Sequence, residues 1–92
     1  MHPSSISVPD GWTITYCDPT LASDDWEAKE DLLQLRHSGL DRLVDLGWYS
    51  DGFRIYVFQG DFQGTLLNER RARDVQTARS VLHALLLQFA QP

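Results

Sequence analysis

Residues 40–58 constrain the fold most strongly, because their pattern predicts two strands joined by a tight turn. From Leu40 to Trp48 the side chains alternate with the period of a strand. Residues 53–58 form the most β-prone run of the chain. Between the two runs lies Asp51-Gly52, a dipeptide that accommodates the two positive φ angles of a type I′ turn. We therefore predict a β-hairpin with a two-residue loop.

Such a loop also sets the register of the hairpin. Three cross-strand pairs follow on one face of the sheet: Ser50 with Phe53, Trp48 with Ile55, and Leu46 with Val57. This face is predicted to cover the core. The opposite face would carry an apolar and aromatic set that also includes two charged side chains, namely Leu43, Asp45, Tyr49, Arg54, Tyr56 and Phe58, and Leu67 of the next strand is a candidate to join it.

The flanking segments supply further predicted elements. Residues 24–38 are expected to form a helix, with Asp24 and Glu27 as its capping box and Gly39 closing its C-terminal end. Residues 12–17 alternate like a half-buried strand, and residues 65–72 form a third strand of the meander whose charges suit a sheet edge. After the capping residue Asp74, a final helix carries an apolar stripe of Val75, Ala78, Leu82, Leu85, Leu86 and Phe89.

These elements predict an α+β fold, an antiparallel β-sheet with two helices packed on one face in the order β-α-β-β-β-α. Residues 1–10 are expected to form a flexible N-terminus and residues 11–92 a single domain. The place of the strand at 12–17 in the sheet stays open.

The charge of the chain limits its partners. The formal net charge is −5, which argues against nucleic acid, because phosphate binding relies on Lys and Arg. Residues 1–51 hold ten acidic and three basic residues, whereas residues 52–92 hold three acidic and five basic ones. This asymmetry would steer a basic partner toward the first half, or it reflects only the solvated faces of the elements.

Several classes of site are not expected. Cys17 is the single cysteine, so no disulfide can form within the chain, and no apolar run approaches the ~18 residues of a membrane span. We find no signal peptide, which makes the cytoplasm the default location. No spacing typical of a metal site, phosphate loop or catalytic nucleophile occurs. We therefore expect no metal, no cofactor and no enzyme activity.

The aromatic sheet face is too apolar to remain fully in water. Three explanations stay open: the N-terminal strand or tail covers it, a second copy pairs with it in a homodimer, or another protein binds it. The candidate partner-binding residues are the acids of the predicted helix and the charged and aromatic side chains of this face, namely Asp24, Asp25, Glu27, Asp45, Tyr49, Arg54, Tyr56 and Phe58.

Two resemblances bear on function. The α-β-β-β-α order of residues 24–89 resembles the double-stranded-RNA-binding domain, a family that contacts phosphates through a basic cluster at the start of its last helix. Residues 74–79 here read DVQTAR, with one basic residue, so RNA binding is not expected. The run from Val44 to Tyr49, followed by a hairpin and a terminal helix, is similar to small bacterial immunity-like proteins. That resemblance implies an acidic inhibitor that neutralises a toxin by binding it.

The sequence thus predicts a non-enzymatic protein-binding module, in one form an acidic inhibitor or immunity-type protein. The alternative is a small structural or regulatory subunit whose sheet face mediates homo-oligomerisation.

Overall fold

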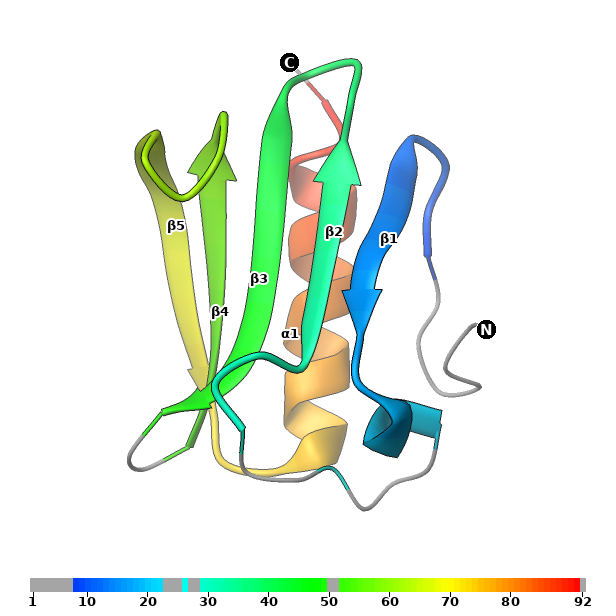
Figure 1. Ribbon diagram of the computed structural model, residues 1–92, viewed down its shortest axis with the longest axis vertical. Helices are drawn as coiled ribbons and strands as arrows, with labels where there is room; N and C mark the ends of the chain where they lie inside the picture. Colours follow the sequence, from blue (N-terminus) through cyan, green and yellow to red (C-terminus); the bar gives the residue numbers. More distant parts are fainter. Residues whose placement is uncertain (1–7, 23–25, 27–28, 50–51, 92) are drawn as a thin grey trace.

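A five-stranded antiparallel sheet covered on one face by a C-terminal helix makes up the fold (Figure 1). The computed structural model describes residues 8–22, 26, 29–49 and 52–91. The strands follow one another across the sheet in chain order. In chain order the elements are β1 (Trp12–Cys17), the short 3-10 helix η1 (Pro19–Ala22), β2 (Leu33–His37), β3 (Arg42–Tyr49), β4 (Gly52–Gln59), β5 (Thr65–Ala72) and the helix α1 (Val75–Gln88).

The predicted helix at 24–38 is wrong, and with it the order β-α-β-β-β-α and the pair of helices. The described residues contain one α-helix, and the element order is β-β-β-β-β-α. Residues 33–37 instead form β2, in which Leu33 and Leu35 are fully buried while Gln34 and Arg36 point to the other face. The predicted capping residues Asp24 and Glu27 lie outside the described residues.

Long-range pairing explains why β2 is a strand. Its backbone is hydrogen-bonded on both sides, since Leu35 pairs with Ile14 of β1 and with Val44 of β3. A central strand satisfies its amides and buries alternate side chains at once, which outweighs a modest local preference for helix. The predicted helix end at Gly39 is the turn between β2 and β3, where Asp41 has a φ of 52°.

The β3–β4 hairpin is confirmed, but its predicted register is wrong. Tyr49 pairs with Gly52, so that residues 50–51 link the strands and Trp48 lies opposite Phe53. This register differs from the predicted one by two residues. Because side chains alternate with a period of two, the faces are unchanged. Val44, Leu46 and Trp48 share the helix side with Ile55 and Val57, as predicted.

The core lies between the sheet and α1. On the sheet, the fully buried side chains include Leu33, Leu35, Val44, Leu46, Ile55 and Val57. The predicted helical stripe is also confirmed, since Ala78, Leu82, Leu85 and Leu86 are buried. As predicted, the carboxylate of Asp74 caps the helix by accepting a hydrogen bond from the Thr77 amide at 2.7 Å.

Both edges of the sheet are defined. The strand β5 forms one edge, as predicted from its charges, and β1 forms the other. Trp12 fastens β1 to the helix, because its indole N–H donates to the Leu86 carbonyl at 2.8 Å. The place of β1 beside β2 answers the question that the sequence left open, and it keeps β1 off the aromatic strands β3 and β4.

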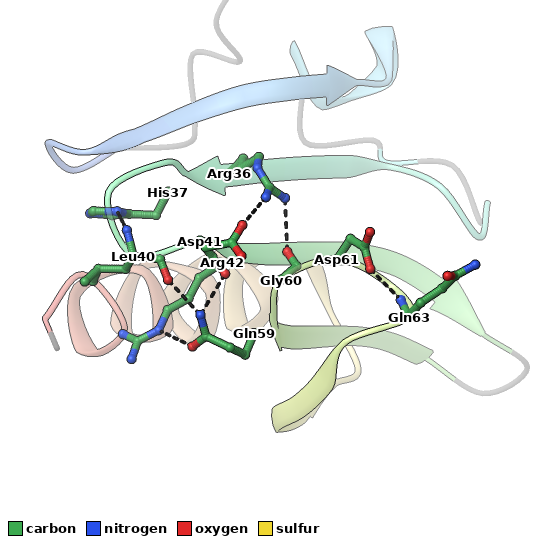
Figure 2. A network of polar contacts seen from close by, with 9 residues as sticks. All are labelled: Arg36, His37, Leu40, Asp41, Arg42, Gln59, Gly60, Asp61 and Gln63. Carbon is green, nitrogen blue, oxygen red and sulfur yellow. Dashed lines mark hydrogen bonds and ion pairs between the residues drawn. The ribbon is translucent and has the colours of Figure 1, made fainter.

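A polar network joins the two turns at one end of the sheet (Figure 2). Arg36 pairs with Asp41 and donates to the Gly60 carbonyl at 3.0 Å. The Gln59 amide donates to the carbonyls of Leu40 and Asp41 at 2.8 and 3.0 Å, and the Gly60 amide donates to Asp41 at 2.6 Å. These contacts hold the β4–β5 turn, residues 60–64, against the β2–β3 turn.

Candidate interaction surface

The outer face of the sheet, the face turned away from α1, carries the candidate surface. Figure 1 shows the sheet in front of α1, with the strands seen from this side. The register assigns to the outer face Gln34 and Arg36 of β2, Leu43, Asp45, Gly47 and Tyr49 of β3, Arg54, Tyr56 and Phe58 of β4, and Leu66, Glu69 and Arg71 of β5.

Four aromatic rings run along this face in mutual contact. Ring centroids lie 5.7 Å apart for Tyr49 and Tyr56, 6.1 Å for Tyr56 and Phe58, and 5.5 Å for Phe58 and Phe62. These spacings are typical of stabilising aromatic pairs. We call Tyr49, Tyr56, Phe58 and Phe62 the aromatic row. Phe62 is 52% exposed, and Leu66, which lies opposite Phe58, is 47% exposed.

Sequence reasoning missed two residues of this surface. Phe62 lies in the turn between Gly60 and Gly64, outside the predicted strands, so no alternation of side chains assigns it to a face. Leu66 was missed because a register shift between Val57 and Phe58 changes which residue of β5 lies opposite Phe58. Such a bulge leaves no mark in the hydrophobic pattern.

Asp45 lies at the centre of the outer face but is hidden from solvent. Its strand neighbours are Gln34 and Tyr56, and the residue is 2% exposed. The Tyr49 hydroxyl donates to Oδ2 at 3.3 Å, whereas among the described residues no donor lies within hydrogen-bond geometry of Oδ1. Burial raises the pKa of Asp45 to about 6, the hydrogen bond from Tyr49 opposes this rise, and the charge of Asp31 adds to it. The Gln34 side chain is close enough to lower the pKa of this carboxyl.

Tyr49 is shielded in the same cluster. Burial raises the pKa of its phenol, and the charge of Asp45 raises it further. Tyr49 is therefore a neutral hydrogen-bond donor at physiological pH. The charged form of the Asp45 carboxyl is therefore destabilised by burial, and the carboxyl is not exposed to a partner.

Gly47 allows the chain before β2 to reach this face. A Cβ atom on Gly47 would lie 1.8 Å from the Glu30 carbonyl oxygen. The segment 29–32 is held beside β3 by two hydrogen bonds, from the Trp48 amide to the Lys29 carbonyl at 2.6 Å and from the Leu32 amide to the Leu46 carbonyl at 3.0 Å. The absence of a side chain on Gly47 thus places Asp31 at the margin of the aromatic row.

The remaining sequence-predicted residues are distributed as follows. Arg54 forms an ion pair with Glu69 at 3.7 Å across β4 and β5. Tyr56 and Phe58 are half-buried members of the aromatic row. Asp24, Asp25 and Glu27 lie outside the described residues.

Other kinds of site find little support in the part of the chain that the structure describes. It contains no group of three His, Cys, Asp or Glu side chains arranged to hold a metal ion. No helix among the same residues combines the length and the apolar character that crossing a membrane requires.

Comparison of the chain with protein-family models, with curated proteins and with solved structures gives no match. The resemblances to immunity-like proteins and to the double-stranded-RNA-binding domain therefore stay predictions. Any functional conclusion depends on the geometry of the outer face.

Proposed function

We propose that this chain is a non-enzymatic protein-binding module whose docking surface is the outer face of the sheet. The observation that carries the proposal is the aromatic row, four rings in contact on the face that α1 leaves uncovered. Aromatic side chains are enriched in protein interfaces, because they bury a large area with little loss of side-chain entropy.

Exposed apolar side chains at one end of the aromatic row support this proposal. Phe62 of the row and Leu66, which lies opposite Phe58, are each more than one-third exposed, in a domain that buries many of its other large apolar side chains. A patch of apolar side chains surrounded by charged ones is typical of an interaction site. Ion pairs border it on both sides, namely Arg36–Asp41 and Arg54–Glu69.

An acidic inhibitor or immunity-type role is one form of this proposal. Asp45 would contribute little charge to such a partner because its carboxylate is buried. Asp31, which is exposed, would supply negative charge beside the aromatic row. The contribution of Asp24, Asp25 and Glu27 to a basic partner stays a prediction from the sequence.

Affinity capture from the native host tests the proposal. The bait chain would be used as wild type, as Phe62→Ser and as Leu87→Ser, with bound proteins identified by mass spectrometry. Phe62 and Leu87 are matched, since they are 52% and 49% exposed, but Leu87 lies on α1 and not on the outer face. Far-UV circular dichroism would verify that each variant is folded.

We expect Phe62→Ser to lose partners that wild type and Leu87→Ser retain. A Tyr56→Ser variant should lose the same partners, because Tyr56 lies in the middle of the row. Equal capture by Phe62→Ser and wild type, or equal loss with Leu87→Ser, would show that the outer face is not the docking surface.

A further inference from the structure

Two pairs of like charges lie on the outer face, one on each side of the aromatic row. On the β5 side, Arg71 lies directly opposite Arg54. Like charges in directly opposite positions destabilise a sheet. The nearby carboxylate of Glu69 pairs with Arg54, while Arg71 is exposed and has no ion pair among the described residues.

On the β2 side the excess charge is negative. The charge of Asp31 acts on the buried carboxyl of Asp45. Asp31 is exposed and likewise has no ion pair within the described part of the chain. It also lines a small hollow of about 200 Å³ with Tyr16 and Gln34. One margin of the aromatic row thus carries an acid and the other an arginine, each without an ion pair to any residue that the structure describes.

These two charges lie at the same level of the sheet. Hydrogen bonds from Leu32 to Leu46 and from Trp48 to Lys29 place Asp31 beside residues 46–48 of β3. Gly47, in the middle of that stretch, pairs with Arg54, which in turn pairs with Arg71. Asp31 and Arg71 therefore stand on opposite sides of the line between β3 and β4, and equally far along the strands.

That arrangement is self-complementary. A two-fold axis above the line between β3 and β4, parallel to the strands, exchanges β2 with β5 and β3 with β4. It would stack Asp31 of each copy on Arg71 of the other, so the contact occurs twice. The same operation brings Phe58 of each copy above the level of the buried Leu43 of the other and keeps the aromatic rows in the centre. Aligned packing of two sheets is the arrangement found in β-sandwiches.

We infer that the occupant of the outer face is a second copy of this chain, in a face-to-face dimer with two-fold symmetry. The inference rests on the proposed function, because it names the partner that the aromatic row binds. A two-fold interface uses the same patch on both copies, so the patch must be complementary to itself. A patch with an acid at one margin and an arginine at the other meets this requirement.

The size of the face is sufficient for such a dimer. The molecule measures 33 × 26 × 19 Å, and the sheet lies across the two longer dimensions (Figure 1). A standard stable interface buries about 800 Å² on each partner, and most of the outer face would supply this area.

Charge exchange tests the inference without an unidentified ligand. The variants Asp31→Arg, Arg71→Asp and the double variant would be compared with wild type by sedimentation equilibrium and light scattering. We expect wild type to reach twice the 10.5 kDa mass of one chain. Each single variant should weaken the dimer by about tenfold, because two attractive contacts become repulsive. The double variant should return to within about threefold of wild type.

Arg70→Asp is the matched control. Arg70 is the exposed neighbour of Arg71 on β5, but it points to the helix side, since it lies opposite Ile55. The milder variants Asp31→Asn and Arg71→Gln serve if a charge reversal fails to fold.

Three results would overturn the inference. They are a wild-type chain that stays monomeric up to millimolar concentration, a dimer that Asp31→Arg leaves intact, or a double variant no better than the singles. A monomeric chain would leave the protein-binding proposal standing, with a different protein as the partner. Loss of the Phe62→Ser effect in affinity capture would instead remove the proposal itself.

Discussion

Asp45 offers the sharpest test of how the outer face is built, because its carboxyl is buried on the central strand and one of its oxygens meets no hydrogen-bond donor in good geometry among the described residues. The substitution Asp45→Asn keeps the shape of the side chain and removes its charge. A carboxyl whose pKa is raised by folding binds more protons in the folded than in the unfolded state. The free energy of unfolding should therefore fall as pH rises from about 4 to about 6.

The magnitude follows from the pKa. Its rise from 3.8 to about 6 corresponds to about 3 kcal/mol, at about 1.36 kcal/mol for each pKa unit. Relaxation of the polar groups around the carboxyl reduces this cost, so we expect about 1–2 kcal/mol. This stability is present below pH 4 and is lost above pH 6 in wild type. In Asp45→Asn no proton is bound at this position, so this part of the pH dependence disappears.

Urea unfolding followed by tryptophan fluorescence, from pH 4 to pH 8, measures the effect. Relative to wild type, Asp45→Asn should gain about 1–2 kcal/mol between pH 4 and pH 7.5. A pH-independent cost from the new amide would shift the whole curve and leave this gain unchanged. Asp10→Asn, at an exposed site, controls for the loss of one negative charge. A constant difference between Asp45→Asn and wild type would refute the reasoning.

Three further variants test the fold. Gly47→Ala should destabilise the domain by about 2 kcal/mol or more in urea unfolding, because the new Cβ would lie 1.8 Å from the Glu30 carbonyl oxygen. The control Gly39→Ala should be nearly neutral, because its nearest contact lies at 3.4 Å. Leu82→Ala should cost about 2–5 kcal/mol in the same assay, and the exposed Leu87→Ala much less; equal costs would contradict the core assignment. Asp74→Ala should lower the thermal midpoint at pH 7, and the difference should shrink as pH falls, because the hydrogen bond from Thr77 lowers the pKa of this carboxyl. A difference that persists at pH 2 would argue against capping by the carboxylate.

Some elements could be predicted because their signals are local. The capping residue Asp74 and the stripe from Ala78 to Leu86 lie within one helix, so their spacing alone defines the buried side. The two faces of the β3–β4 hairpin were also predictable. A period of two keeps each side chain on its face even though the turn lies one residue earlier than Asp51-Gly52 indicates.

The segment that became β2 could not be predicted from local signals. Leu32, Leu33 and Leu35 suit the apolar side of a helix as well as a strand, and nearby acids resemble a helix start. Whether this segment forms a helix or a strand depends on the pairing of Leu35 with Ile14 and Val44. These residues come close to Leu35 only once the sheet forms. Two neighbouring strands supply hydrogen bonds and burial that no window of the sequence contains.

The sequence by itself determined the terminal helix, the hairpin and the identity of the aromatic face, because alternation and helical spacing are properties of neighbouring residues. Only the tertiary structure decided that Asp45 is buried, that Phe62 and Leu66 extend the aromatic row, and that Asp31 and Arg71 stand level on opposite margins. These features depend on register and on a bulge between strands. The register and the bulge are stabilised by hydrogen bonds and side-chain contacts between segments, and these contacts exist only after the chain has folded.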